Sequence, residues 1–275
     1  MLAPMRTLLT ALSAAALPAA ALASEEVPFV TTPDAVTQAM LELAGVGPAD
    51  HVIDLGSGDG RIVITAAKRF GASGLGVEIV PALVDTSRDN ARRAGVAGRT
   101  EFRVQDLFAT DLSRATVVTM YLLPDVNLQL RPRLLALAPG TRIVSHDWDL
   151  GDWAPEGTLS IDRPDKPLGR EKVSRVHLWT VPARVHGLWC LEGEAAGAAL
   201  QVVQRFDHFS AVLQWPGQPA PAVVFDGRIR GGSRLEGTGL SAIVLRWTPQ
   251  ALVGESGPPG WPGRRFRAAV DGRCG

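Results

Sequence analysis

The sequence predicts an α/β fold, in which a doubly wound, mostly parallel sheet carries an antiparallel hairpin at one edge and is followed by a small β-rich domain. Between residues 32 and 146, apolar strand-like segments alternate with amphipathic helix-like segments. Strands separated by helices pair in parallel through right-handed crossovers. Between 158 and 182 apolar residues alternate without an intervening helix, as in a hairpin, and beyond 184 no helical period remains.

The elements of the sheet domain follow from their apolar periodicity and flanking residues. Thr32-Pro33 can cap and start a helix whose apolar residues Val36, Met40 and Leu43 share one face. The expected strands are 51–55, 74–79, 101–105, 115–121 and 141–146; the later helices are 61–70, 81–94 and 124–137, the last with a kink at Pro132.

Residues 184–275 form the predicted β-rich domain. Segments such as LQVVQRF, PAVVFDGRI and AIVLRW are strand-like and are separated by stretches rich in glycine and proline. This pattern is typical of a small barrel or a sandwich, and we expect a structural or docking role for it. Cys190 and Cys274 lie near its two ends, where a disulfide would close the domain.

Residues 1–23 resemble a signal peptide, which leaves 24–183 for the sheet domain. Arg6 supplies a positive end, residues 8–22 are apolar, and Ala21-Leu22-Ala23 matches a cleavage site. We therefore expect a periplasmic or secreted protein, in which a disulfide would be stable. An uncleaved membrane anchor and a disordered alanine-rich leader are the alternatives. No other segment is long and apolar enough to span a membrane.

Charge and residue spacing exclude two classes of partner. Lys and Arg together number 28, as do Asp and Glu, so the net charge is zero. Nucleic-acid-binding domains usually carry a basic excess, and we therefore predict no nucleic-acid partner. The five histidines and two cysteines show no metal-ligand spacing, so we predict no metal site.

The stretch VIDLGSGDGRIVITAA, residues 52–67, predicts a strand, a glycine loop around Ser57 and a helix. Such a loop presents backbone N–H groups and a helix N-terminus to a ligand. Its glycines, Gly56, Gly58 and Gly60, are spaced G-x-G-x-G and not G-x-G-x-x-G as in dinucleotide-binding proteins. Asp54 and Asp59 would repel a pyrophosphate but attract the ammonium and sulfonium of S-adenosylmethionine. A dinucleotide oxidoreductase is therefore the last-ranked hypothesis.

Two further acidic residues follow the next strands. Glu78 lies 20 residues after Gly58, where a carboxylate can accept both ribose hydroxyls of a nucleoside. Asp106, with the adjacent Leu107, is placed to meet the adenine and its exocyclic amine. Together with Asp54, these acids stand at the carboxyl ends of three successive parallel strands, where such sheets bind ligands.

Three motifs in this order resemble one family. They are DLGSGDGR at 54–61, ATVVTMYLLP at 115–124 and PGTRIVSHDWDLGDW at 139–153. The first resembles motif I of the class I, seven-stranded, Rossmann-like S-adenosylmethionine-dependent methyltransferases. The set is similar to a small family of protein lysine methyltransferases, whose characterised members modify mitochondrial membrane proteins and which has bacterial relatives. The resemblance covers residues 29–182 and includes neither the leader nor the β-rich domain.

The resemblance implies S-adenosylmethionine as cofactor and a protein lysine as acceptor. It also implies that residues 28–32 fold over the cofactor, with Thr31 or Thr32 at its carboxylate. Tyr121 to Pro124 stand where amine-methylating relatives carry an acid or amide, prolines and an aromatic residue. We expect Tyr121, Pro124 and His146 to act in methyl transfer. The alternatives are a core aromatic for Tyr121 and a structural role for His146.

The third motif supplies the expected surroundings of the acceptor. We expect His146, Asp147 and Asp149 at the rim of the substrate cleft and Trp148 and Trp153 as its apolar walls. Asn127 is expected on the exposed side of its helix. Two functional alternatives remain to a lysine methyltransferase: a methyltransferase of small molecules, and an exported module that binds S-adenosylmethionine without turnover.

Overall fold

The computed structural model describes residues 30–163, 172–193, 197–215, 217, 223–238, 242–257, 261–270 and 272–274. The predicted signal peptide lies outside these residues. Among the described residues, no helix has the length and apolar character needed to cross a bilayer.

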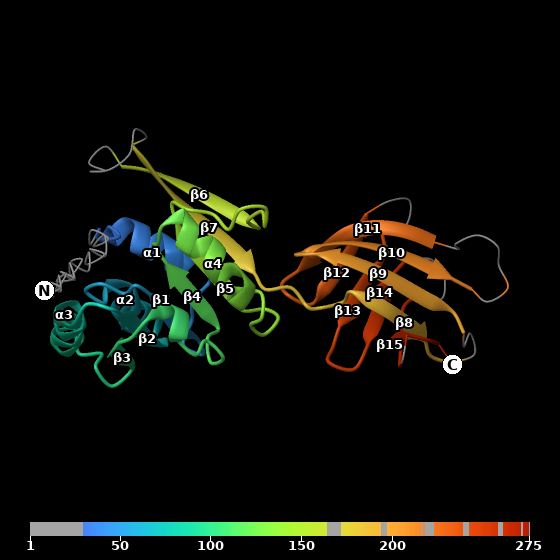
Figure 1. Cartoon of the computed structure of the whole chain (residues 1–275), viewed down its shortest axis with the longest axis horizontal. Helices are drawn as coiled ribbons and strands as arrows, with labels where there is room; N and C mark the ends of the chain where they lie inside the picture. The colour runs from blue at the N-terminus through green and yellow to red at the C-terminus, as the bar shows by residue number, and fades with distance from the viewer. Residues whose placement is uncertain are drawn as a thin grey trace, which may run out of the picture. The chain divides into compact units, whose positions relative to one another are not determined.

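A seven-stranded sheet forms the first part of the described chain (Figure 1). The strand order is β3-β2-β1-β4-β5-β7-β6, in which the first five strands are parallel and β7 is antiparallel to both β5 and β6. The strands are β1 (His51–Leu55), β2 (Ser73–Glu78), β3 (Thr100–Val104), β4 (Val117–Met120), β5 (Arg142–His146), β6 (Gly157–Asp162) and β7 (Val173–Thr180). The predicted fold class is therefore confirmed.

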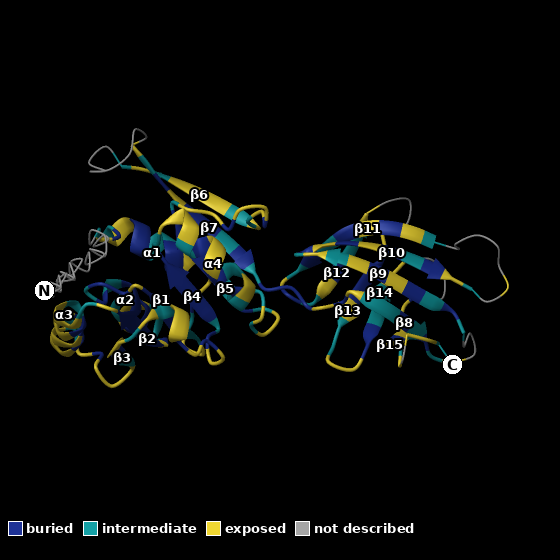
Figure 2. Ribbon diagram, in the orientation of Figure 1, coloured by how far each residue is buried: buried dark blue, intermediate teal, exposed yellow. Residues whose placement is uncertain are grey.

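Helices cover both faces of this sheet. They are α1 (Asp34–Leu43), α2 (Arg61–Phe70), α3 (Pro81–Arg93) and α4 (Pro124–Leu134), with a short 3-10 turn, η1 (Leu107–Ala109). Side chains of α1 and α2 pack with alternate strand residues such as Val52 and Val117, whereas α4 packs with the intervening ones, such as Ile53 and Val118. Successive strand residues point to opposite faces, so each central strand is buried on both sides. Figure 2 shows these strands buried and the edge strand β6 largely exposed.

The elements differ from the predicted ranges mainly at their ends. Strand β4 spans Val117–Met120 and α4 ends at Leu134, both shorter than expected. Pro132 lies inside α4. The N-cap of α1 is Pro33, and no side chain caps this helix, so Thr32 does not have the capping role that we expected.

The second part is a closed barrel of eight antiparallel strands, in the order β8 to β15 with β15 paired to β8 (Figure 1). The strands are β8 (Gly187–Leu191), β9 (Ala199–Arg205), β10 (His208–Gln214), β11 (Val223–Arg230), β12 (Arg234–Thr238), β13 (Val244–Trp247), β14 (Leu252–Ser256) and β15 (Arg265–Ala268). Closure removes the unpaired strand edges that an open sheet would expose. The barrel decides between the two architectures that the sequence left open.

Aromatic side chains fill the barrel. Phe209 and Phe225 meet edge to face with centroids 5.9 Å apart, and Trp261 and Phe266 continue the cluster. Cys190 on β8 forms a disulfide with Cys274, 84 residues later, as the sequence suggested. The last strand of the sheet ends at Thr180 and the first of the barrel begins at Gly187, on either side of the predicted boundary at 183/184.

Candidate active site

The glycine loop between β1 and α2 has the backbone that its sequence requires. Gly56, Gly58 and Gly60 have φ angles of 75°, 54° and 81°, in the left-handed region that glycine adopts at least cost. The N–H groups of Gly56 and Ser57 both donate to the carbonyl of Val77, each over 2.9 Å. These bonds fix the loop against β2, and Gly60 stands at the N-terminus of α2.

Close packing holds the loop as well. A Cβ atom at Gly60 would lie 2.8 Å from the Phe102 ring, and one at Gly56 would lie 3.0 Å from Leu122. Gly76 on β2, which the sequence analysis did not single out, is as constrained, because its Cβ would lie 2.6 Å from Phe102 and 2.7 Å from Ser57 Oγ. A glycine inside a strand often marks such an approach, and that signal was present.

Glu78 stabilises the loop through backbone hydrogen bonds that the sequence did not reveal. Its Oε2 accepts from the Gly58 N–H over 3.1 Å. Its Oε1 accepts from the N–H groups of Ile79 and Val80 over 2.8 and 3.1 Å. Each carboxylate oxygen has about two acceptor positions, so Oε2 keeps room for a hydroxyl while Oε1 is filled. This arrangement favours a ribose contact through one oxygen over the bidentate contact that we expected.

Asp54 is a buried carboxylate at the end of β1. It is 2% exposed and accepts a hydrogen bond from Thr119 Oγ1 over 2.7 Å. Burial, opposed by the hydrogen bond from Thr119 and assisted by the negative charges of Glu78 and Asp59, raises the pKa of Asp54 to about 7. A bound cation would offset the energetic cost of burying the ionised Asp54 and the repulsion between Asp54 and the carboxylates of Glu78 and Asp59. Thr119, the polar residue in the buried strand VVTM, is a functional residue that the sequence analysis missed.

Arg61 ties the segment before α1 to the loop. Its Nε and Nη2 donate to the Asp59 carboxylate over 2.9 and 2.7 Å, and its Nη1 donates to the Thr32 carbonyl over 2.9 Å. Asp59 therefore pairs with Arg61. We expected both Asp54 and Asp59 to attract the cationic cofactor, and only Asp54 has no cationic partner among its described contacts. The hydrogen bond from Arg61 Nη1 places the Thr32 backbone near the loop, and a contact between Thr32 and the cofactor stays a prediction.

The region where we expect the adenine is exposed and apolar. Asp106 is exposed, and its Oδ1 accepts from the Phe108 N–H over 2.8 Å, which caps η1. Large apolar side chains are exposed in these segments: Ile79 after β2 at 65%, Val104 at the end of β3 at 50% and Phe108 in η1 at 40%. Val104 pairs with Glu78 in the sheet register. The exposed side chains offer a surface on which a planar base can pack, with Asp106 and Leu107 at its edge.

Tyr121 and His146 lie together at the ends of β4 and β5. Their ring centroids are 3.9 Å apart. His146 is 2% exposed, with Nε2 3.0 Å from Ser174 Oγ and Nδ1 3.4 Å from Thr32 Oγ1. It is therefore buried beneath the site, and its predicted place at the cleft rim is wrong. The catalytic role of His146 stays a prediction.

The Tyr121 hydroxyl donates to Asp147 Oδ2 over 3.2 Å. Burial, and then the neighbouring Asp147 charge, raise the pKa of Tyr121 to about 12, so the phenol is protonated near neutrality. The same hydroxyl cannot act as a base there, but it can donate a hydrogen bond. Pro124 begins α4 and is exposed.

Two predictions about the surroundings of the acceptor are wrong. Trp153 is 1% exposed, and its carbonyl accepts from Trp179 Nε1 over 2.8 Å, so it belongs to the core and does not line the cleft. Asn127 is fully buried. It shares a helix face with Leu130 and Leu134, at positions i, i+3 and i+7, and this periodicity could have placed it correctly. Trp148, by contrast, is 44% exposed.

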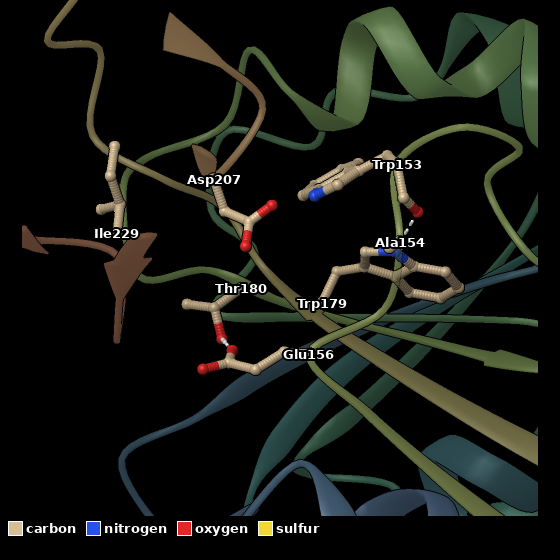
Figure 3. A pocket seen from close by; sticks show the side chains of 7 residues that line it. All are labelled: Trp153, Ala154, Glu156, Trp179, Thr180, Asp207 and Ile229. Atoms are coloured by element: carbon tan, nitrogen blue, oxygen red, sulfur yellow. Dashed lines mark hydrogen bonds between the residues drawn. The ribbon is translucent and has the colours of Figure 1, made fainter. Parts of the chain in front are cut away.

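A small pocket lies beside Trp153 and Trp179 (Figure 3). Two of its hydrogen bonds are drawn in Figure 3. Trp179 Nε1 donates to the Trp153 carbonyl over 2.8 Å, and the Thr180 hydroxyl donates to Glu156 Oε2 over 2.7 Å. The remaining lining residues are Ala154, Asp207 and Ile229. Of the residues predicted for the site and its surroundings, only Trp153 lines this pocket.

The residues at the strand ends fit S-adenosylmethionine. The glycine cradle leaves no room for side chains, Ser57 Oγ is buried without a hydrogen-bond partner, and Asp54 is a buried acid without a cationic partner among its described contacts. Asp54 suits a cationic amino-acid moiety, Glu78 a ribose, and Asp106 with Leu107 an adenine. When bound, this cofactor supplies an electrophilic methyl group on a sulfonium.

Comparisons with known proteins agree with this geometry. Residues 54–157 match the family model of the ANTKMT methyltransferase domain. The chain is 45% identical over 138 residues to a protein-lysine N-methyltransferase of Saccharolobus islandicus, across 50% of this chain and 86% of that protein. It is 34% identical over 131 residues to the adenine nucleotide translocase lysine N-methyltransferase of Mus musculus, across 47% of this chain and 57% of the mouse protein.

A similar solved structure contains the demethylated form of S-adenosylmethionine. The RNA methyltransferase from Salinibacter ruber, in complex with S-adenosyl-L-homocysteine, is 52% identical, with a TM-score of 0.52. The match covers 57% of this chain and 96% of the Salinibacter ruber chain. It therefore covers nearly all of a methyltransferase that holds the demethylated cofactor.

Proposed function

Because the chain belongs to the class I S-adenosylmethionine-dependent methyltransferases, in the family of protein-lysine N-methyltransferases, we propose that it methylates the ε-amine of a lysine in a protein. The observation that carries the proposal is the contact between the acceptor segment and the cofactor loop. Leu122, next to Tyr121, packs so closely on Gly56 that a Cβ there would lie 3.0 Å from it. An amine held at Tyr121 is thus adjacent to the methyl donor.

The chemistry needs positioning and a neutral amine. Methyl transfer is an in-line displacement, to which the enzyme contributes mostly orientation. A lysine amine has an ordinary pKa of about 10.4, which desolvation and a nearby cation both lower. The sulfonium is such a cation, so no strong base is required. His146 is buried and hydrogen-bonded, and Tyr121 is protonated near neutrality, so neither side chain offers a strong base. This agrees with a mechanism that needs none.

Cofactor binding and acceptor class are tested in two steps. The full chain is titrated calorimetrically with S-adenosylmethionine and with NAD, and we expect binding of the former only, lost in Glu78→Ala. The chain is then incubated with methyl-labelled cofactor and separate fractions of protein, RNA and small metabolites. Labelled methyllysine, identified by mass spectrometry in the protein fraction, supports the proposal.

Each other outcome contradicts the proposal in a different way. Label in RNA would assign the class named for the Salinibacter ruber protein, and label in metabolites would assign a small-molecule methyltransferase. Binding without transfer to any fraction would favour a non-catalytic module.

We also propose that the protein is exported to the periplasm or secreted. The apolar leader with its cleavage motif and the Cys190–Cys274 disulfide support this, because disulfides persist in oxidising compartments. Cell fractionation with mass spectrometry of the N-terminus tests it. A chain found in the cytosol with both thiols reduced would contradict export, and an intact leader in the membrane fraction would indicate an anchor.

A further inference from the structure

Asp147 is held in a backbone conformation that few residues adopt. Its φ angle is 64°, one of two positive values among the described non-glycine residues. Its N–H donates to the Arg175 carbonyl over 2.6 Å, and its Oδ1 accepts from the Arg175 N–H over 3.0 Å. Both bonds join it to β7. Asp and Asn tolerate the left-handed region better than most residues.

Helix α4 holds the residues that follow. Asn127 Nδ2 lies 3.2 Å from the carbonyls of both Trp148 and Asp149, and 3.3 Å from Ser145 Oγ. The turn that carries Asp147 is therefore fixed from β7 on one side and from α4 on the other. A carboxylate fixed in this way is pre-organised for a ligand.

The second carboxylate oxygen faces the acceptor side. Asp147 Oδ2 accepts from the Tyr121 hydroxyl over 3.2 Å and lies 3.6 Å from His146 Nε2. The Asp147 side chain is 11% exposed. Tyr121 is next to Leu122, which packs on the cofactor loop at Gly56. Strand β4 lies between β1 and β5 in the sheet, so the carboxylate stands one strand away from that loop.

An exposed apolar residue follows both Tyr121 and Asp147 in the sequence. Leu123 comes two positions after Tyr121 and is 48% exposed, and Trp148 directly follows Asp147 and is 44% exposed. A lysine side chain has an apolar stem and a cationic head. The stem of the lysine suits such apolar surroundings, and its head suits a mostly buried carboxylate such as that of Asp147.

We propose that Asp147 is the carboxylate that positions the acceptor amine, with Oδ2 shared between the amine and the Tyr121 hydroxyl. The inference rests on the proposed lysine methylation and names the residue that selects a primary amine for it. Nothing in the spacing of the sequence assigned more to Asp147 than a place at the cleft rim.

The reaction moves a positive charge toward Asp147. The neutral amine nitrogen uses its lone pair to form the new N–C bond while the C–S bond breaks, and the electrons of that bond remain on sulfur. The charge of the sulfonium thus passes to the nitrogen, and the product ammonium later loses a proton to solvent. A carboxylate beside the nitrogen stabilises this developing charge more than it stabilises the neutral amine.

The same carboxylate makes the bound amine easier to protonate. A negative charge nearby raises the pKa of an amine. Among the described residues, the titratable or charged groups near Asp147 include His146 on β5, Tyr121 after β4 and His177 on β7, while Arg175 on β7 contacts it through its backbone N–H. Removing the Asp147 charge should therefore move the acid limb of the rate profile to lower pH while it lowers the plateau rate.

The first test uses the single tyrosine of the chain. Full-length protein labelled with ¹³Cζ-tyrosine and saturated with S-adenosylhomocysteine is titrated with n-butylammonium chloride, and n-butanol serves as the neutral probe. We expect the Tyr121 resonance to shift saturably with the ammonium only. The dissociation constant should rise at least tenfold in Asp147→Asn and stay unchanged in Asp162→Asn, which alters an exposed acid on β6. Equal binding by Asp147→Asn, or no shift in the wild type, would overturn the inference.

The second test measures methyl transfer to a lysine-containing protein acceptor. We expect kcat of Asp147→Asn to fall about 10- to 100-fold, with the acid limb shifted down in pH and cofactor affinity unchanged. Asp147→Gly, which relaxes the backbone and also lacks the carboxylate, should behave the same, so misfolding is controlled. A wild type that binds butylammonium through Asp147 but methylates no lysine would contradict the proposed function. It would still support Asp147 as the residue that binds an amine.

Discussion

At the scale of single residues, Asp54 combines burial with a charge that has no cationic partner among its described contacts. Its folded pKa of about 7 lies above its ordinary value of 3.8. The folded, cofactor-free protein therefore holds a proton on Asp54 between about pH 4 and 7, where the unfolded chain has lost it. By linkage, the contribution of Asp54 to stability falls as pH rises through this window.

The first prediction concerns cofactor affinity and pH. A cation binds better to the ionised Asp54, so the affinity for S-adenosylmethionine should fall about tenfold per pH unit below 7 and level off above it. Calorimetry in buffers of different ionisation enthalpy should show release of a proton at pH 6. In Asp54→Asn the affinity should be weaker and should lack this pH dependence, and a variant with the wild-type profile would refute the assignment.

Asn127 carries the second prediction. Asn127→Ala removes the Nδ2 donor, whose two hydrogens are shared among Ser145 Oγ and the carbonyls of Trp148 and Asp149. We expect the free energy of unfolding to fall by about 1–3 kcal/mol. Urea denaturation measures the change, and Gln129→Ala, at an exposed position of the same helix, is the matched control. Equal losses of stability in both variants would mean that the hydrogen bonds of Asn127 add nothing to the free energy of unfolding.

At the scale of elements, the glycine loop depends on a strand as much as on its own sequence. Gly56, Gly58 and Gly60 could be predicted because their requirement is local: a turn with positive φ angles between a strand and a helix. Gly76 and Asn127 carried local signals, a glycine inside a strand and a helix face shared with Leu130. The partners of these two residues, like that of Thr119, are brought close only by the fold and could not be derived locally. Thr119 faces Asp54 only because β4 pairs with β1 in one register.

Gly76 carries the third prediction. A methyl group there would meet Phe102 and Ser57 at under 3 Å, so Gly76→Ala must displace the ring or the loop. We expect a loss of about 1–3 kcal/mol in stability and weaker S-adenosylmethionine binding. Thermal unfolding and calorimetry measure these effects. Gly98→Ala, where a Cβ meets nothing within 4 Å, should change neither, and a neutral Gly76→Ala would contradict the packing argument.

At the scale of the whole molecule, the barrel is closed twice, by the pairing of β15 with β8 and by the Cys190–Cys274 disulfide. Local sequence predicted strands and turns here but could not choose a barrel over a sandwich. That choice depends on the pairing of Phe266 with Leu191, which are far apart in the chain. The parallel sheet was easier to predict, because its helical crossovers restrict the topology.

The fourth prediction follows from the disulfide. Cys190→Ser combined with Cys274→Ser should lower the free energy of unfolding by about 2–5 kcal/mol, because the bridge spans 84 residues and restricts the unfolded chain. Reductant should lower the Tm of the wild type toward that of the double variant and leave the variant itself unchanged. A wild type indifferent to reductant would show that the bridge contributes no stability.

The left-handed backbone at Asp147 also makes this position informative in other sequences. Sterically, only Asp, Asn and Gly fit such a turn at little cost. Two of the three lack the charge, so a relative can lose the carboxylate at this position and keep its fold and its cofactor. Among aligned relatives, the residue at this position should therefore separate enzymes that accept an amine from those that have changed acceptor. One residue would then serve as a marker for sorting uncharacterised members of the family.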